Sequence, residues 1–476
     1  MSSRPPPPPR KRAAVPHRRT GRSTTTKRRP KPKTQRDESA PLPKKRVPPI
    51  RYPVLPRILR AGITRPELDE LTQSLSWQRK VPVIEPVRVN ARHLHIAMVG
   101  WEYPPVYAGG LGVHVYELTK ELTRMGHRVT FLTPFSGPFH DVPGVTFIWP
   151  TDPENEDRPY PPAYWAIEEA QPGQQNAIDA YNEWVGTRTE LKGVDVVHVH
   201  DWFGTVGAVT LAHRLKVPLV MTMHSTEYDR SLNNPWTEIL VRETIGLTQA
   251  DRVIAVSRHL KQQLIHRFRV PADRIRVVYN AVRPAERLAR LEATQSIVLY
   301  LGRLVAMKGV ETFLRAAAKA APHTTGTLFV VAGEGPEYPR LLMLAAHLGI
   351  ADRVLFLGRV SEDERSLLLA AASVFVLPSV VEPFGIAALE AMVAGVPTIV
   401  SKTSGVAEVT ENIFALDFWD IDEFASRIVE LLRYPALRHS MGTRGRWDAL
   451  KSGWPERTLE TVAVYMEVVE RGAPRT

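Results

Sequence analysis

Short apolar runs alternate with amphipathic stretches along the chain from residue 93 onward. The first half holds five such runs: HLHIAMVG, RVTFLTP, DVVHVHD, PLVMTMHS and DRVIAVS. They are short and rich in branched side chains, which is typical of buried strands. Between the first two runs, Val115, Leu118 and Leu122 share one face at helical spacing, so we expect a helix there. Strands that alternate with helices in this way predict an α/β domain with a parallel sheet.

The same alternation starts again near Ser296, with five more apolar runs: SIVLYLGR, GTLFVVAGEG, RVLFLGRV, SVFVLPS and PTIVS. The stretch VETFLRAAAKAA has the pattern of a helix between two of these strands. We therefore expect two doubly wound, Rossmann-like domains in tandem, at 93–285 and 286–455, facing each other across a cleft. A final helix at 456–476 can cross back to the first domain.

The first 50 residues differ from the rest in composition. They hold 16 Lys and Arg against Asp37 and Glu38, so the chain's net charge of +12 arises there, and they also contain 12 prolines. Such a segment buries too little apolar surface to offset the entropy of ordering, so we expect a disordered basic arm at 1–50. The arm is either merely solvated or contacts anionic partners such as nucleic acid, acidic lipid or polyphosphate. Residues 51–92 are expected to form a linker with one helix.

The chain contains no cysteine, which excludes disulfides, cysteine-based zinc sites and a cysteine nucleophile. No run of about 18 consecutive apolar residues is present, so we expect no transmembrane helix. These features predict a cytoplasmic protein, and peripheral contact with a membrane is left open. The oligomeric state is not indicated.

Polar residues that follow the strands are the candidates for a site, because ligands of open parallel sheets bind beyond the carboxyl ends of the strands. Gly109, Gly110 and Gly112 follow the first strand and open a helix, where free N–H groups can approach an anion. The same glycines also fit an ordinary tight turn between a strand and a helix.

Three histidines lie near the ends of two neighbouring strands. His198 and His200 share one face of a strand, with His200 at its carboxyl end, and His224 ends the next strand. A metal site is conceivable, but no carboxylate-rich set with ligand spacing accompanies them, so we expect no metal. We expect His200 to lie in the cleft and His198 to be a hydrogen-bonded core residue.

Arg303 and Lys308 lie five residues apart in the loop after the first strand of the second domain. Basic residues on a loop are usually solvent-exposed, but these two flank a strand end beside glycines, where an anion would bind. A planar guanidinium and a compact ammonium suit a diphosphate.

Two carboxylates are eight positions apart in the stretch VVEPFGIAALEAMVAGVP. Pro383 suits the first position of a helix, which would place Glu382 at the helix mouth and Glu390 about two turns in. The separation would then be roughly 12 Å along the axis, about the span from the hexose to the ribose of a nucleotide sugar. The alternative is a helix with two ordinary surface glutamates.

Together these motifs resemble the retaining glycosyltransferases of family 4, which have the GT-B fold, over about residues 93–470. The most specific element is Glu382-x7-Glu390. The stretch WEYPPVYAGGLGVHVYEL is similar to the opening of glycogen and starch synthases. Bacterial glycogen synthases carry K-T-G-G where this chain has Tyr107-Ala108-Gly109-Gly110, which weakens that narrower likeness and leaves the family likeness intact.

The resemblance implies roles for particular residues. Those implied to be catalytic are His200, Arg303, Lys308 and Glu382. Those implied to bind the donor are Gly109, Gly110, Arg303, Lys308, Gly358, Arg359, Val360, Glu382, Phe384, Gly385 and Glu390. Candidates on the acceptor side are Glu102, Asp201 and His224. The D-x-D of metal-dependent glycosyltransferases is matched by Asp420–Asp422, but we interpret this DID as a helix cap. No cofactor and no metal are therefore expected.

The predicted function is transfer of a hexosyl unit, favoured to be glucosyl, from a nucleoside-diphosphate sugar to a carbohydrate or lipid acceptor, with an α-glucan as one candidate. Alternatives are a sucrose- or trehalose-type disaccharide synthase, a phosphorylase and a cell-envelope glycosyltransferase. A different class remains open, in which the protein is a binding protein recruited to anions or nucleic acid through its basic arm.

Overall fold

The computed structural model describes residues 92–105, 109–135, 137–150, 172–283, 295–451 and 453–472, without side chains at 172–177. The predicted basic arm, the linker helix, Tyr107 and Ala108 lie outside these residues. No helix in the described ranges is long and apolar enough to cross a membrane.

The first sheet has seven parallel strands in the order β3-β2-β1-β4-β5-β6-β7. They are β1 (His95–Val99), β2 (Arg128–Leu132), β3 (Val145–Ile148), β4 (Val196–His200), β5 (Leu219–Met223), β6 (Arg252–Ala255) and β7 (Ile275–Val277). The strand order changes direction between β1 and β4, which makes this pair the switch point of the sheet. The loops after β1 and β4 therefore open at the place where doubly wound sheets bind ligands.

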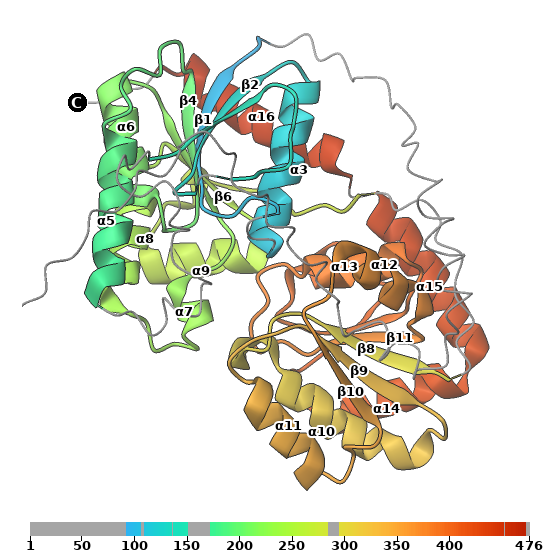
Figure 1. Cartoon of the computed structure of the whole chain (residues 1–476). Coiled ribbons are helices and arrows are strands. Elements are labelled where there is room, and N and C mark those ends of the chain that lie inside the picture. The colour runs from blue at the N-terminus through green and yellow to red at the C-terminus, as the bar shows by residue number, and fades with distance from the viewer. Residues whose placement is uncertain are drawn as a thin grey trace, which may run out of the picture. The chain divides into compact units, whose positions relative to one another are not determined.

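Helices cover both faces of the first sheet (Figure 1). They are α3 (Gly110–Arg124), α5 (Pro172–Gly186), α6 (Thr205–Leu215), α8 (Thr237–Gln249) and α9 (Arg258–Phe268), while the single turn α7 (Glu227–Arg230) lies in the loop after β5 and packs beside α8. Alternate residues of β1 serve the two faces, because Ala97 and Val99 belong to one buried cluster while Ile96 and Met98 belong to the other. All four side chains are fully buried, as expected for a central parallel strand.

The second sheet has six parallel strands in the order β10-β9-β8-β11-β12-β13. They are β8 (Ile297–Leu301), β9 (Leu328–Ala332), β10 (Val354–Gly358), β11 (Val374–Leu377), β12 (Thr398–Ser401) and β13 (Phe414–Leu416). Its switch point is between β8 and β11. The loops after these two strands carry Arg303, Lys308 and Glu382.

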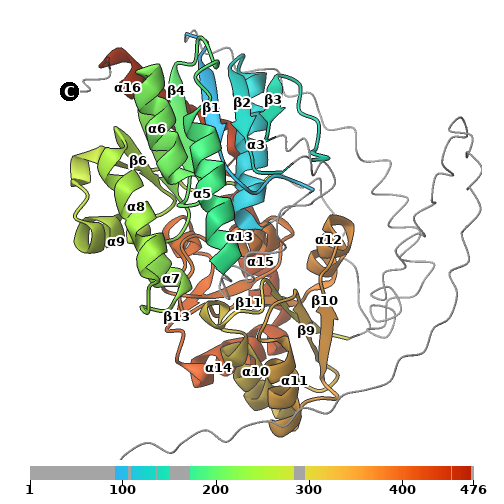
Figure 2. The ribbon, with the colours of Figure 1, turned by 60° about the vertical axis from the view of Figure 1, so that its left-hand side comes forward.

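The helices of the second sheet are α10 (Val310–Ala320), α11 (Tyr338–His347), α12 (Glu362–Ala371), α13 (Ile386–Val393), α14 (Ile421–Arg433) and α15 (Pro435–Leu450). Helix α10 packs beside α11 and α14, while α13 packs beside α15 (Figure 2). Helix α14 begins at the cap that the sequence predicts, since the Asp420 carboxylate accepts a hydrogen bond from Glu423 N at 3.0 Å.

The last helix, α16 (Trp454–Glu470), packs against α3 and the first sheet. Its Tyr465 hydroxyl lies 2.6 Å from His198 Nδ1, and both residues are fully buried. Glu467 forms an ion pair with Arg252 at 2.8 Å. The chain therefore leaves the second sheet and returns to the first through α16.

Removing the Tyr465 side chain should destabilise the protein. Tyr465→Ala deletes a buried ring and leaves a cavity, so we expect a loss of about 3–5 kcal/mol in the free energy of unfolding. Tyr465→Phe keeps the ring and loses only the hydroxyl bond to His198, which should cost about 1 kcal/mol. Urea unfolding followed by tryptophan fluorescence measures both losses. Equal losses in the two variants would contradict the docked position of α16.

Candidate active site

Glu382 lies in the loop after β11, where it forms a parallel bridge with Ser404. Its carboxylate accepts hydrogen bonds from Lys308 Nζ at 2.7 Å and from Ser379 Oγ at 3.1 Å. The side chain is only 8% exposed. Lys308 and Glu382 are 74 positions apart in the sequence, so only the fold brings this ammonium and this carboxylate together.

The predicted start of the helix after Glu382 is wrong. Helix α13 begins at Ile386, and Gly385 is its N-cap residue with φ of 102°. Pro383 and Phe384 instead belong to the loop, where Val406 N donates to the Phe384 carbonyl at 2.7 Å. Pairing of this loop with the segment after β12 delays the helix by three residues. The spacing of roughly 12 Å, which assumed a continuous helix, therefore does not apply.

Lys308 ends a short 3-10 helix, η2 (Ala306–Lys308), in the loop after β8. Gly309 follows with φ of 66°, and a Cβ atom there would overlap the carbonyl of Pro378. This position therefore requires glycine, because the backbone of the β8 loop lies directly on that of the β11 loop. The close approach puts the Lys308 ammonium within reach of Glu382. Arg303 lies in the same loop with an exposed side chain.

Glu390 is the fifth residue of α13 and faces α12. Its carboxylate lies 3.3 Å from Arg365 Nη2. Burial raises the pKa of Glu390, while the Arg365 charge lowers it. Gly358, at the end of β10, has φ of 72°, and Arg359 beside it is exposed and forms a loose ion pair with Glu334 at 3.7 Å. The Val360 side chain is half-buried against the core of the second sheet.

Glu102 lies at the N-terminus of α3, where the predicted glycine loop begins. Its carboxylate accepts a hydrogen bond from Gly112 N at 2.9 Å, and a Cβ atom at Gly109 would lie 2.9 Å from the same oxygen. Burial raises the pKa of Glu102, and the Arg303 charge and the backbone hydrogen bonds lower it. An internal carboxylate thus occupies the anion position expected for a phosphate. Gly110 lies close to the second domain, since a Cβ atom added to it would be 3.7 Å from Ile386 Cδ1 at the start of α13.

The histidines at the ends of β4 and β5 are more buried than the sequence indicates. His198 is a core residue as predicted, bonded to Thr222 Oγ1 at 2.7 Å. His200 is fully buried, so it has no surface on the cleft, and its Nδ1 lies 3.1 Å from His224 Nε2. Asp201 accepts a hydrogen bond from His224 N at 2.7 Å. Burial raises the pKa of Asp201 to about 6, although the Arg230 charge opposes this shift.

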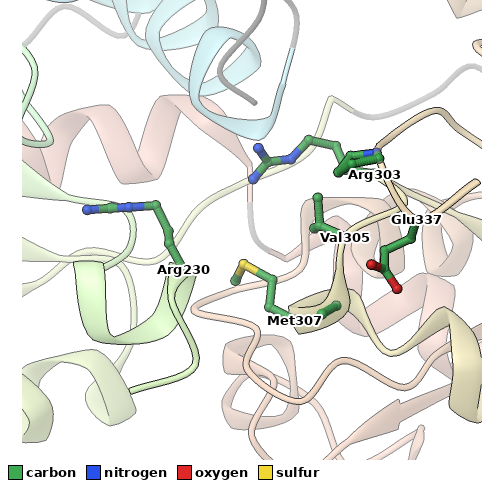
Figure 3. Close-up of a pocket in the computed structure, with 7 residues that line it drawn as sticks. Arg230, Arg303, Val305, Met307 and Glu337 are labelled. Carbon is green, nitrogen blue, oxygen red and sulfur yellow. The ribbon is translucent and has the colours of Figure 1, made fainter. Parts of the chain in front are cut away.

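A cavity of about 160 Å³ lies between residues of the two sheets. Arg230 lines one side of it from the end of α7, with its guanidinium turned away from Arg303, Val305, Met307 and Glu337 on the other side (Figure 3). This volume is below the usual range of about 300–1,000 Å³ for a whole small-molecule site, so it accommodates one group of a larger ligand. Sequence reasoning missed Arg230, because nothing in the string EYDR distinguishes it from a surface charge.

Buried carboxylates hold the Arg230 side chain, which is 6% exposed. Glu227 on its own helix lies 3.1 Å away and Glu243 on α8 lies 2.5 Å away. Glu243 is completely buried and also accepts a hydrogen bond from Glu227 N at 3.1 Å. Burial raises the pKa of Glu243 to about 7, against the opposing effect of Arg230.

An acidic side chain of the second domain also contacts the first domain. The Glu408 carboxylate, from the 3-10 helix η4 (Gly405–Glu408), accepts hydrogen bonds from Arg258 N at 2.7 Å and His259 N at 2.8 Å. A residue of the second domain thus caps helix α9 of the first. Because η4 follows Ser404 directly, this cap is continuous with the loop that holds Glu382.

Both halves of the chain match known glycosyltransferases. Residues 108–286 match Glycosyltransferase Family 4, and residues 285–448 match Glycosyl transferases group 1. The chain is 31% identical over 408 residues to an uncharacterized glycosyltransferase of Methanocaldococcus jannaschii, a match that covers 79% of this chain and 99% of the relative. It is 30% identical over 344 residues to a glycogen synthase of Mycobacterium tuberculosis, covering 67% of this chain and 80% of that protein.

Solved structures agree on the fold. A sucrose-phosphate synthase from Thermosynechococcus elongatus is similar with a TM-score of 0.68 and 24% identity, over 80% of this chain and all of that chain. The catalytic domain of starch synthase IV from Arabidopsis thaliana, bound to ADP and acarbose, is similar with a TM-score of 0.62 and 17% identity, again over 80% of this chain and all of that chain. The chain therefore belongs to glycosyltransferase family 4 and has the GT-B fold, which confirms the predicted family and fold class.

The buried Glu243 should make stability fall as the pH rises. Its pKa of about 7 in the folded protein exceeds the ordinary value of 4.5 for a glutamate, so the folded state binds the extra proton between these values. Its contribution to the free energy of unfolding is therefore greatest below pH 4.5 and declines by about 3 kcal/mol up to pH 7. Urea unfolding of wild type and Glu243→Gln at several pH values measures this difference.

Glu183→Gln, which removes an exposed carboxylate from α5, is the matched control. We expect its stability to follow that of the wild type across the pH range. If Glu243→Gln did the same, the carboxyl would not hold its proton in the folded protein.

Proposed function

We propose that the protein transfers a glucosyl or related hexosyl unit from a nucleoside-diphosphate sugar to a carbohydrate acceptor, with retention of configuration. The observation that carries the proposal is the contact of 2.7 Å between Lys308 and Glu382 at the switch point of the second sheet. These two residues match the family's donor-site pattern, and each comes from a loop that follows one of the two switch-point strands. An acid and a base at this edge suit a ligand with both hydroxyls and phosphates.

The Lys308 and Arg303 cations would stabilise the leaving group. When the bond between the anomeric carbon and the phosphate oxygen breaks, negative charge grows on the diphosphate. Cations fixed at that position lower the barrier because they interact more strongly with the transition state than with the substrate. This role requires no metal at the diphosphate.

Glu382 would bind the sugar hydroxyls. Its Oε2 accepts hydrogen bonds from Lys308 Nζ and Ser379 Oγ. When Lys308 turns to the phosphate, the carboxylate becomes available to accept hydrogen bonds from the hexose. Glu390, held by Arg365 on α12, would accept the ribose hydroxyls with its second oxygen. The acceptor hydroxyl would attack from the face that the leaving group vacates and pass its proton to the departing phosphate oxygen.

Most names of the relatives favour a sugar or cyclitol acceptor. They include a glycogen synthase, D-inositol 3-phosphate glycosyltransferases and an alpha-maltose-1-phosphate synthase. The name of a further relative, an N-acetyl-alpha-D-glucosaminyl L-malate synthase, contains a hydroxy acid instead. We propose an α-glucan or a smaller sugar or sugar phosphate as the acceptor of this enzyme. The cavity between Arg230 and Arg303 would receive one group of the bound substrates.

A donor screen tests the proposal. Purified protein incubated with ADP-, UDP- and GDP-sugars should show a rise in Tm and slow hydrolysis with at least one of them. Lys308→Ala should lower turnover with that donor by about 100-fold or more, because a preorganised charge on the leaving group is lost. Lys319→Ala removes an exposed lysine paired with Asp422 and should leave turnover unchanged. Normal turnover in Lys308→Ala would refute the site.

The two glutamates should differ in kinetics. Glu382→Gln should lower kcat, because its sugar contacts strengthen as the glycosidic bond breaks. Glu390→Gln should raise the donor KM by about 10-fold with little change in kcat, since contacts to ribose are equal in substrate and transition state. Steady-state kinetics at varied donor concentration separates the effects. A fall in kcat for Glu390→Gln alone would reverse the assigned roles.

A further inference from the structure

Three histidines from three different elements meet beneath the loops of the first switch point. His114 lies on α3, His200 ends β4 and His224 follows β5. Each offers one ring nitrogen such that the three atoms all lie within 4.8 Å of one another. His114 is 5% exposed and His200 is fully buried, while His224 is partly accessible. His114 is far from the other two in sequence, so the fold creates the cluster.

Two of the ring nitrogens in this cluster lack hydrogen bonds. His114 Nε2 and His200 Nε2 are buried and have no partner among the described residues. His114 Nδ1 lies 2.6 Å from Asn280 Oδ1, and an amide oxygen can only accept, so the proton of His114 is on Nδ1. The lone pair of His114 is therefore on Nε2. A buried acceptor without a partner costs about 1–3 kcal/mol, which a ligand at that position would offset.

The arrangement has the features of a metal site with three imidazole ligands. His200 Nδ1 and His224 Nε2 share a hydrogen bond of 3.1 Å, which an ion bound to both nitrogens would replace. This separation is close to the value of about 3.3 Å between two nitrogens on a tetrahedral zinc ion. The hydrogen bond from His114 to Asn280 is the kind of outer contact that orients a ligating histidine. The widest spacing of 4.8 Å exceeds that value, so binding would draw the partly accessible His224 ring inward.

We propose that His114, His200 and His224 bind one divalent transition-metal ion, of the kind that zinc and cobalt(II) represent. The ion would lie at the floor of the first domain, between α3 and the ends of β4 and β5, and not beside Lys308. Three protein ligands leave a fourth position for water or a hydroxyl group. Its presence would fix the N-terminal half of α3 against the sheet whichever donor the enzyme uses.

A cobalt titration tests this site on the full chain. Protein stripped with a chelator should bind one Co²⁺ per chain, with the intense visible absorption of a four-coordinate ion, and Zn²⁺ should displace it. His114→Gln and His224→Gln should each weaken binding by more than 100-fold. Asn280→Ala keeps all three ligands and removes only the orienting bond, so it should weaken binding by about 10- to 100-fold. His213→Gln, on the exposed side of α6, should bind as the wild type.

Two outcomes would overturn the proposal. Wild-type protein that binds no Co²⁺ and gains no Tm with Zn²⁺ would show that the cluster holds water or nothing. Unchanged binding in both His114→Gln and His224→Gln would place the ion elsewhere on the chain. Circular dichroism of each variant without metal shows whether a loss of binding comes from unfolding. If a variant does not fold, the change in Tm of the wild type on adding Zn²⁺ tests the site instead.

Discussion

The ion pair between Lys308 and Glu382 is the interaction on which the proposed donor side of the site depends. It joins the loops that follow the two switch-point strands of the second sheet, and it exists because Gly309 lets their backbones touch. Both side chains are largely buried, 17% and 8% exposed, so losing one partner would leave a charge without compensation. The pair therefore holds both side chains in position before a substrate binds.

The loop that holds Glu382 is also linked to the first domain. Glu382 pairs with Ser404, and Glu408, four residues further on, caps helix α9 with two hydrogen bonds. Negative charge at a helix N-terminus is favourable by about 0.3–1 kcal/mol or more when partly buried. A rigid-body separation of the halves would break these bonds and expose the N-terminus of α9. The geometry of the donor loop and the closeness of the two domains are thus coupled through one short segment.

Local patterns predict most of the fold and part of the site. All ten apolar runs form strands, and nine of them bury four or five consecutive residues, which leaves a clear signal in the sequence; β10 buries only two. The sequence pattern does not predict strands β3, β7 and β13, since they have only three or four residues and several of these residues are half-exposed. The Glu382–Lys308 contact is predictable only through family resemblance. The burial of Glu243, the cap by Glu408 and the late start of α13 depend on distant backbone, which no local pattern encodes.

Internal carboxylates already occupy several positions that a substrate would use. Glu102 accepts the amide at the start of α3, Glu382 holds Lys308, and Glu243 holds Arg230. A diphosphate would then replace a carboxylate that already pairs with each cation. The net free energy of binding would therefore be smaller than the new contacts alone suggest. Such an exchange favours a ligand that also satisfies the displaced carboxylates. A sugar diphosphate does this, because it brings hydroxyl donors for Glu382 together with the phosphates for Lys308, whereas inorganic phosphate would leave the carboxylate unpaired.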